Sequence, residues 1–340
     1  MMSRQFAALA SRLSALTLLW VTVLAPVVSI ATESAPTTRP PLTLAVADLL
    51  YAAPVLIAEA QGYFAAEGLA LKVMHCAVGR ICLQHVLEGQ AHFATVADTP
   101  FVLAAFSHKD LAIIATTTVS GSELRMVARQ DRGVGRAADL RGRRIGIVQG
   151  TSGHYYADTF LLFAGLKSAD VTLVPLGPSA IVGALSRGEI DAAGLHDPLG
   201  RDAARQLGPL GRVLPGPRFF TLTFNLVSAG PRAGVLTEDE TRLLRAVRRA
   251  EALIRQEPER ARAILAVALK MDAAKVAEVW GDFEFRLQLG QPLIHGLEAQ
   301  ARWALREGLV PAGARMPNFL ELIQTEPLRR IDPQAMRLIR

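Results

Sequence analysis

The sequence predicts an α/β protein in which two α/β lobes are joined by a double hinge, with a ligand cleft between them. Its 340 residues are too many for one hydrophobic core of ordinary size, which favours two cores. Short hydrophobic runs typical of buried strands alternate with helix-like segments. A segment near residue 90 is also repeated imperfectly 99 residues later. A hydrophobic content of 51% with 20% charged residues is typical of a globular protein.

The N-terminal residues 1–31 have the layout of a secretory signal peptide. Arg4 and Arg12 precede an apolar stretch, and Ser29 and Ala31 supply the small side chains expected before a cleavage site. The same apolar stretch is nearly long enough to be an uncleaved anchor helix, but the small residues at its end favour cleavage. We therefore expect an exported protein that resides in the periplasm.

The sequence holds two cysteines, Cys76 and Cys82. In an exported protein such a pair is a candidate disulfide, provided that the two Cα atoms lie within about 7 Å of each other. The alternative is a pair of free thiols. Two cysteines alone do not make a zinc site. Because no cysteine precedes Cys76, we expect no lipid-modified N-terminal cysteine.

A first round of strands and helices follows a polar, proline-rich linker at 32–41. Strands are expected at 42–47, 69–75, 92–97 and 111–119, and helices at 54–68, 81–89 and 100–108. Pro54 near the start of the first helix and Gly89 at the end of the second are typical boundary residues. The short connections predict a largely parallel sheet covered on both faces.

A second round begins at residue 124. Strands are expected at 124–129, 144–149, 170–176 and 190–195, helices at 152–164, 179–188 and 198–208, and a returning strand at 219–229. After residue 236 the pattern becomes helical, with a capping box formed by Thr237 and Glu240 and with helices beginning at Pro258, Asp272 and residue 292. Trp280 and Trp303 lie at helical spacing in this part and are expected to pack in its core.

The internal echo relates 87–100 to 186–198. At a constant offset, Gly89 aligns with Gly188 and Asp98 with Asp197, and each aspartate is closely followed by a proline. This predicts two lobes with one plan, in which both aspartates act as helix N-caps. Such caps lie at the carboxyl ends of strands, where open α/β sheets bind ligands.

The chain is expected to cross between the lobes twice, near 119–123 and again near 221–229. Two crossings make a double hinge. A ligand that touches both lobes would favour the closed arrangement.

Four segments, at 54–73, 87–100, 139–153 and 184–198, resemble the substrate-binding proteins of ABC importers in the nitrate/sulfonate/taurine group, which also includes pyrimidine-precursor binders. The resemblance covers roughly 42–310. It implies a type II periplasmic-binding-protein fold and delivery of a small solute to an inner-membrane permease and its ATPase. Lobe 1 would comprise 42–120 with 224–340, and lobe 2 would comprise 121–223.

Two positions depart from the family pattern. His92 stands where the family usually has aspartate, which affects a helix–strand junction. The segment DLLYAAP at 48–54 lacks the asparagine and histidine that the pyrimidine-precursor group usually carries there, so that ligand class is less favoured.

The segment VQGTSGHYY predicts one wall of the cleft. Thr151, Ser152 and Gly153 lead into a helix whose N-terminus favours an anion, unless it is a cap that faces solvent. His154 in the first turn either adds a donor or points away. Arg80 is either a partner for a sulfonate, carboxylate or nitrate group, or a surface arginine.

Among the histidines, His196 at the end of the echo strand is the best candidate for ligand contact, and its alternative is a satisfied core histidine. Further candidates lie at strand ends or on the crossing strands: Asp48, Tyr51, Asp98, Thr99, Thr117, Asp197 and Asn225.

Enzymatic motifs fit poorly. GTSGH is not a nucleophile elbow because His154 replaces the final glycine, and neither a phosphate-loop motif nor HExxH occurs. A net charge of +6 without a dense basic run argues against nucleic-acid binding. We therefore expect a monomeric, cofactor-free receptor for a small anionic solute. The alternatives are a pyrimidine-precursor-type enzyme or binder on the same scaffold and a periplasmic ligand sensor.

Overall fold

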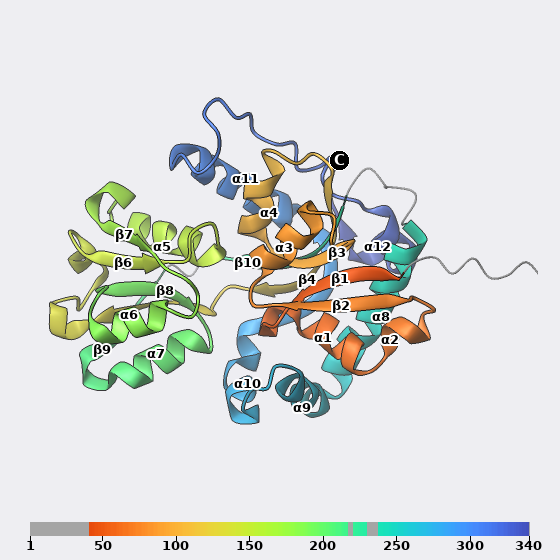
Figure 1. The fold of residues 1–340 in the computed structure, drawn as a ribbon, viewed down its shortest axis with the longest axis horizontal. Coiled ribbons are helices and arrows are strands. Elements are labelled where there is room, and N and C mark those ends of the chain that lie inside the picture. Colours follow the sequence, from red (N-terminus) through yellow and green to blue (C-terminus); the bar gives the residue numbers. More distant parts are fainter. Residues whose placement is uncertain (1–40, 217–219, 230–236, 340) are drawn as a thin grey trace, which may run out of the picture. The chain divides into compact units, whose positions relative to one another are not determined.

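The computed structural model describes residues 41–216, 220–229 and 237–339. The expected signal peptide and nearly all of the expected linker therefore lie outside the described residues. Within the described part, no helix is long and apolar enough to cross a membrane. The described chain contains two separate β-sheets, each covered by helices (Figure 1).

The first sheet has seven strands in the order β12-β11-β4-β10-β3-β1-β2. Their bounds are β1 (Leu42–Ala47), β2 (Leu71–Cys76), β3 (Phe93–Ala97), β4 (Leu111–Ser120), β10 (Leu222–Ala229), β11 (Phe283–Gly290) and β12 (Met336–Arg337). Strand β1 runs parallel to β2 and β3, whereas β10 lies antiparallel between β3 and β4. The returning strand β10 thus closes the first sheet, as expected for a chain that comes back from a second lobe.

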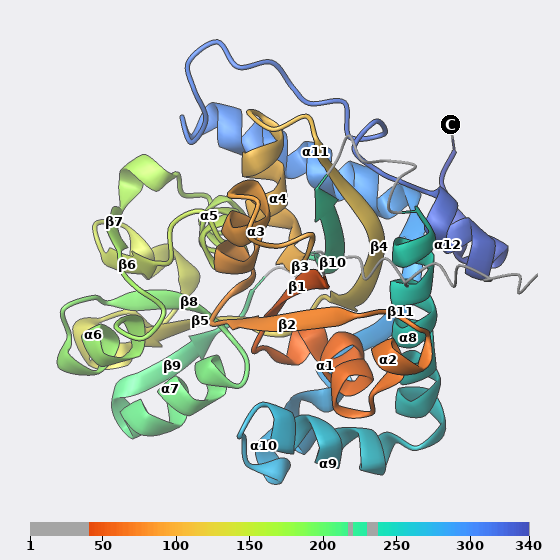
Figure 2. The same cartoon turned by 45° about the vertical axis from the view of Figure 1, so that its right-hand side comes forward.

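Nine helices of the described chain pack around this sheet. They are α1 (Ala53–Ala60), α2 (Tyr63–Ala66), α3 (Gly79–Leu87), α4 (Asp98–Ala105), α8 (Thr237–Gln256), α9 (Pro258–Ala268), α10 (Ala273–Val279), α11 (Gln291–Arg306) and α12 (Glu326–Ile331). Helix α8 contacts α1, α2 and α12, so the C-terminal segment completes the first lobe (Figure 2). The helix expected at 54–68 is divided because Gly62 adopts a left-handed conformation, with φ of 67°.

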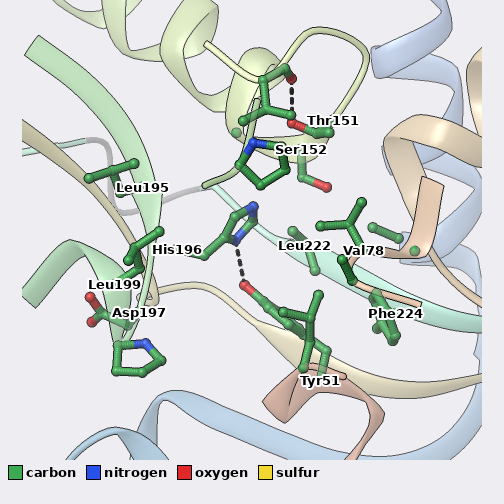
Figure 3. Close-up of a pocket in the computed structure, with 18 of the residues that line it drawn as sticks. Tyr51, Val78, Thr151, Ser152, Leu195, His196, Asp197, Leu199, Leu222 and Phe224 are labelled. Carbon is green, nitrogen blue, oxygen red and sulfur yellow. Dashed lines mark hydrogen bonds between the residues drawn. The ribbon is translucent and has the colours of Figure 1, made fainter. Parts of the chain in front are cut away.

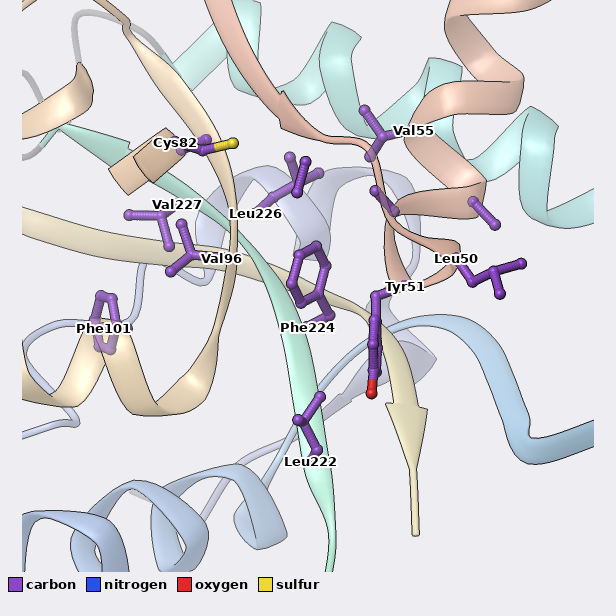
Figure 4. Close-up of a cluster of buried hydrophobic side chains, with 14 of the residues drawn as sticks. Leu50, Tyr51, Val55, Cys82, Val96, Phe101, Leu222, Phe224, Leu226 and Val227 are labelled. Atoms are coloured by element: carbon purple, nitrogen blue, oxygen red, sulfur yellow. The ribbon is translucent and has the colours of Figure 1, made fainter. Parts of the chain in front are cut away.

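The core of this lobe surrounds β10. Phe224 is buried beside Tyr51, with ring centroids 5.4 Å apart, while Val96 and Phe101 belong to the same hydrophobic cluster (Figure 4). Tyr51 belongs to a 3₁₀ turn at Leu50–Ala52, directly after β1. Burial of these side chains ties the first turn of the chain to the returning strand.

The second sheet has five strands in the order β7-β6-β8-β5-β9. They are β5 (Leu124–Arg129), β6 (Arg144–Ile147), β7 (Thr172–Pro175), β8 (Ala192–His196) and β9 (Gly211–Leu214), and they are covered by α5 (Ser152–Phe163), α6 (Ile181–Arg187) and α7 (Leu199–Leu207). All five strands lie between residues 124 and 214, and on this basis we propose the division into lobe 1 (42–120 with 224–340) and lobe 2 (121–223).

Several sequence expectations need correction. Both sheets are mixed rather than largely parallel, because β10 and β5 run antiparallel to their neighbours. The region after residue 236 is not purely helical, since β11 pairs with β4. Asp98 is the first residue of α4, and Pro198 holds the N-cap position of α7. Both aspartates nevertheless accept a backbone N–H at the start of the helix, Asp98 from Thr99 and Asp197 from Arg201.

The expected capping box of Thr237 and Glu240 stays a prediction, because the residue before α8 lies outside the described residues. Glu240 is buried and accepts a hydrogen bond from Gln324 Nε2 at 2.6 Å. By contrast, Asp272 is the N-cap of α10 and accepts from the backbone N–H of Ala274.

Candidate ligand-binding site

A cavity of about 520 Å³ lies between the two sheets and takes its walls from both lobes. Its lining is mainly apolar. The apolar residues include Leu49, Ala77, Val78, Pro100, Phe224, Leu269 and Met271 from lobe 1, Leu222 at the start of the returning strand β10, and Val148, Pro178, Ile181, Leu195 and Leu199 from lobe 2. A cavity of this size and character is typical of a site for a small organic molecule.

The N-terminus of α5 forms one polar wall of this cavity, where Thr151, Ser152 and Gly153 line it. Thr151 Oγ1 donates to the carbonyl of Val148 at 2.6 Å, so this hydroxyl shapes the turn. The backbone N–H groups of Ser152 and Gly153 have no acceptor among the described residues. Two free N–H groups at the positive end of a twelve-residue helix can bind an acceptor.

Gly153 lets this helix approach strand β8 closely. A Cβ atom at this position would lie 3.3 Å from the carbonyl oxygen of Gly194 and 3.7 Å from Nε2 of His196. Nε2 of His196 therefore lies beside the N-terminus of α5. Figure 3 shows the His196 ring between Ser152 above it and Tyr51 below it.

His196 is held by polar partners from both lobes. Its Nδ1 lies 2.8 Å from the hydroxyl of Tyr51 (Figure 3). The same nitrogen lies 3.0 Å from Oε2 of Glu123. Tyr51 is 3% exposed and Glu123 is 1% exposed, whereas the imidazole keeps about a third of its surface open. The ring is thus anchored through one nitrogen and presents the other to the cavity.

Arg80, in the first turn of α3, lines the opposite wall. It is exposed and has no ion-pair partner among the described residues. Its Cδ lies 3.9 Å from the position that a Cβ on Gly150 would occupy, so its stem reaches the loop before α5. The guanidinium can therefore reach a negatively charged ligand without losing an existing partner.

Asp197 also lines the cavity, but its carboxylate is already paired. Oδ2 lies 2.6 Å from Nε of Arg125 and 2.9 Å from Nε of Arg201. Burial raises the pKa of Asp197, while the two arginines act in the opposite direction. We conclude that the Asp197 carboxylate forms part of the cavity wall and holds Arg125 and Arg201 in position.

Contacts between the lobes flank the cavity on two sides. On one side, α7 meets α10, where Lys275 Nζ lies 2.7 Å from Asp202 Oδ2 and Arg205 NH1 lies 2.9 Å from Glu278 Oε1. On the other side, the Trp303 ring packs 5.1 Å from that of His154. The two lobes therefore make direct side-chain contacts beside the cavity.

Four of the expected ligand residues instead support the crossing strands. Asp98 accepts from the backbone N–H groups of Thr99 and Thr223, at 2.8 and 3.0 Å. The other contacts are Thr99 to Gln300, Thr117 to the carbonyl of Phe224, and Asn225 to Thr116. All four residues are buried outside the cavity lining, because their polar groups satisfy partners within the first lobe.

Two more expected residues point elsewhere. Asp48 accepts from His75 Nδ1 at 2.7 Å on an exposed edge of the first lobe. His154 turns from the cavity toward Trp303, and its burial lowers its pKa. Of the expected residues, the structure thus brings seven to the cavity, namely Tyr51, Arg80, Thr151, Ser152, Gly153, His196 and Asp197.

Cys76 and Cys82 are free and buried, and each thiol influences the pKa of the other. The Cys82 thiol lowers the pKa of Cys76, while burial raises the pKa of Cys82. All four residues at 77–80 line the cavity. The two cysteines thus lie directly before and shortly after a segment of the chain that lines the cavity.

Sequence reasoning missed two parts of the site. The first is Glu123, whose only sequence signal was a charged residue at the expected crossing between lobes. The second is the turn at 269–275 between α9 and α10, which contributes Lys270 and Lys275 to the lining. The capping aspartate at 272 predicted this turn but not its position beside the cavity.

Comparison with known proteins agrees with this geometry. Residues 50–198 match the family model described as NMT1/THI5 like. A Brucella abortus protein described as a binding protein is 28% identical over 236 residues, which is 65% of this chain and 68% of that protein. The taurine-binding periplasmic protein of Escherichia coli is 26% identical over 164 residues, which is 48% of this chain and 49% of that protein.

Solved structures share the fold. The periplasmic aliphatic sulphonate binding protein SsuA of Escherichia coli superimposes with a TM-score of 0.70 at 19% identity, covering 89% of this chain and 95% of that one. The desulfurization enzyme DSZB, bound to biphenyl-2-sulfinic acid, gives a TM-score of 0.63 at 17% identity, with coverage of 85% and 98%. At these identities the likeness shows the periplasmic-binding-protein fold.

Proposed function

Because residues 50–198 match the NMT1/THI5-like family model and the chain is similar to taurine-binding and aliphatic sulfonate-binding proteins, we propose that it captures a small organic anion between its lobes in the periplasm and delivers it to a membrane permease. The observation that supports this most is the cavity between the two sheets, where free backbone N–H groups, His196 and Arg80 converge. We propose no chemical step for the solute.

The lining favours an organic solute over a bare inorganic anion such as nitrate. Most walls are aliphatic or aromatic, and they include Val78, Ile181, Leu195 and Phe224. An inorganic ion in this space would lose its hydration against apolar surface, which is unfavourable without full hydrogen bonding. An apolar body of several carbons would instead gain by burial there.

The polar end of the solute would lie at the start of α5. The N–H groups of Ser152 and Gly153 can donate to an oxyanion, and the helix N-terminus favours its negative charge. Arg80 can form paired hydrogen bonds with a carboxylate or sulfonate from the opposite wall. An anion held by α5 and Arg80 touches both lobes, so it would stabilise their closed arrangement.

A thermal-shift and calorimetric screen tests this proposal. The panel contains 1-butanesulfonate, taurine, benzoate and nitrate, with 1-butanol as the uncharged counterpart of the first. We expect the organic acids to raise the melting temperature, since a ligand at a hundredfold excess over its Kd adds about 2.7 kcal/mol to the free energy of unfolding. Equal shifts with 1-butanol, or shifts with nitrate alone, would contradict the proposed solute class.

The variant Arg80→Ala should weaken binding of any acid that shifts the protein. Arg212→Ala is its matched control, because Arg212 is an exposed arginine on β9 outside the cavity lining. The loss expected for one charged hydrogen-bonding partner is about 1.5–3 kcal/mol of binding free energy. Equal affinities of the two variants would remove Arg80 from the site.

A further inference from the structure

The carboxylate of Glu123 is buried and does not lie at the protein surface. It lies on the crossing from β4 to β5 and is 1% exposed. Among the described residues, His196 is the only basic side chain within ion-pair distance, at 3.0 Å. The backbone N–H of Asp197 also donates to the carbonyl of Glu123 at 2.8 Å. The crossing and the end of β8 are therefore joined by a side-chain contact and by a backbone hydrogen bond.

The partners of His196 decide which ring nitrogen carries the proton when the ring is neutral. Nδ1 faces both the Glu123 carboxylate and the Tyr51 hydroxyl. If Nδ1 were bare, its lone pair would face a buried carboxylate and leave that oxygen without this donor, which is costly. With the proton on Nδ1, the ring donates to Glu123, and the buried carboxylate keeps this donor.

The Tyr51 hydroxyl fits the same arrangement. Its oxygen lies 2.8 Å from Nδ1 of His196, and burial raises the pKa of Tyr51 well above its ordinary value, so the phenol keeps its proton. Its ring is fixed by Phe224 and Phe283, at centroid distances of 5.4 and 5.0 Å. Because Tyr51 belongs to lobe 1 while Glu123 and His196 face it from lobe 2, the cluster is complete only when the lobes are closed.

We propose that Glu123 is a positioning residue that holds the proton of neutral His196 on Nδ1 and so turns Nε2 toward the cavity as an acceptor. The part of this inference that concerns solute binding rests on the proposed function. A bare Nε2 beside the N–H groups of α5 repels an anion until it gains a proton. An anionic solute therefore binds together with one proton, which passes from solvent to Nε2 and is balanced by the charge of Glu123.

This proton coupling makes the site selective for acids. A neutral solute without a hydrogen-bond donor meets a bare nitrogen and gains nothing from it. The other ionisable groups that line the cavity are Arg80, Asp197, Asp202, Lys270, Asp272 and Lys275. Of these, Asp197 is paired with Arg125 and Arg201, and Asp202 with Lys275. Arg80, with no partner of its own, adds positive charge in the closed site.

Nitrogen NMR tests the tautomer without any solute. The protein is labelled with ¹⁵N in its seven histidine rings, and His196→Gln identifies the signals of this ring. At alkaline pH we expect the neutral ring of the wild type to carry its proton on Nδ1. The variant Glu123→Gln keeps the size of the side chain but loses its charge, and it should move the ring toward the Nε2 tautomer. Wild-type signals of the Nε2 tautomer, or identical signals in both proteins, would overturn the inference.

Calorimetry tests the coupled proton with 1-butanesulfonate as the probe. In buffers of different ionisation enthalpy, the wild type should take up close to one proton per bound anion at alkaline pH, and Glu123→Gln should bind at least about tenfold more weakly, which corresponds to 1.4 kcal/mol. Binding without proton uptake would contradict the inference.

The two proposals fail in different ways. Absence of binding by every acid in the panel would contradict the proposed solute class, while the NMR result would still decide the role of Glu123. Acid binding that His196→Gln leaves unchanged would show that the solute lies elsewhere. If His196→Gln weakens binding and Glu123→Gln does not, the solute site stands and the positioning role of Glu123 is wrong.

Discussion

Lys275 on α10 and Asp202 on α7 form an ion pair between the two lobes, with Nζ and Oδ2 2.7 Å apart. Both residues also line the cavity. A parallel pair, Arg205 with Glu278, joins the same two helices. The closed arrangement is therefore supported at the edge of the site by charges that belong to different lobes.

Replacing Lys275 by methionine should favour the open arrangement and weaken solute binding. Because both partners are partly exposed, we expect a loss of no more than about 1 kcal/mol. The affinity of the wild type for 1-butanesulfonate should fall between about 10 mM and 1 M salt, and the variant should show a smaller fall, since salt screens the missing pair.

A control for this prediction is Arg141→Met, which removes an exposed ion pair with Asp170 inside lobe 2. It should leave both the affinity and its salt dependence unchanged. If both variants behave alike, the effect of Lys275 arises from net charge and not from the contact between lobes.

Gly79 should be intolerant of a side chain. A Cβ atom there would lie 3.1 Å from the carbonyl oxygen of Thr95 and 3.2 Å from Cα of Val96. These atoms belong to β3, which is held by strands on both sides and cannot yield. We expect Gly79→Ala to lower the free energy of unfolding by about 1–3 kcal/mol in urea titrations, as for other overpacked sites.

The matched control is Gly296→Ala within α11, where a Cβ would meet nothing within 4 Å. This change should stabilise the protein by about 0.5–1 kcal/mol through helix propensity. Equal effects at the two positions would show that the close approach of α3 to β3 is not limiting.

The two-lobe architecture could be predicted because it depends on local patterns. Strand–helix alternation and glycine boundaries are readable over ten residues, and the segment at 148–156 does place Thr151, Ser152 and Gly153 on the cavity wall. Strand β11 could also have been predicted, since apolar and other residues alternate in FEFRLQLG. It was missed because the segments on both sides of it have helical patterns.

The rest of the site depends on contacts between distant segments. Glu123 meets His196 across 73 residues, and no local pattern marks that pair. Asp48 and Asp98 both follow strands, yet their side chains turn to His75 and to Thr223. A strand end fixes where the backbone stops, whereas the direction of the next side chain depends on which neighbours supply hydrogen-bond partners.

Asp98 should make the stability of the protein depend on pH. Burial raises its pKa from the ordinary value to about 6. Between about pH 4 and pH 6 the folded protein therefore holds a proton that the unfolded chain has released, so the free energy of unfolding falls as pH rises through this window. Below about pH 4 both states are protonated and the contribution is fully present.

Thermal unfolding of the wild type and Asp98→Asn across this range measures the effect. The difference between the two proteins should change by about 2–3 kcal/mol from pH 4 to pH 7, because one pKa unit corresponds to about 1.4 kcal/mol. Parallel pH profiles would assign the ionisation to another group, such as Asp197 or Glu240, whose pKa values are also raised by burial.

Oxidation of Cys76 and Cys82 should stiffen one wall of the cavity. Each thiol already influences the pKa of the other, and residues 77–80 between them line the site. A disulfide acceptor of the periplasm would take two electrons and two protons from the pair, and the bond would stabilise the protein by about 2 kcal/mol through closure of a short loop. Alkylation followed by mass spectrometry of the exported protein should find no reactive thiol before reduction, and reduction should lower the melting temperature. In the Cys76→Ser, Cys82→Ser double variant the reductant should have no effect, and two freely alkylated thiols in the exported wild type would show that the pair stays reduced.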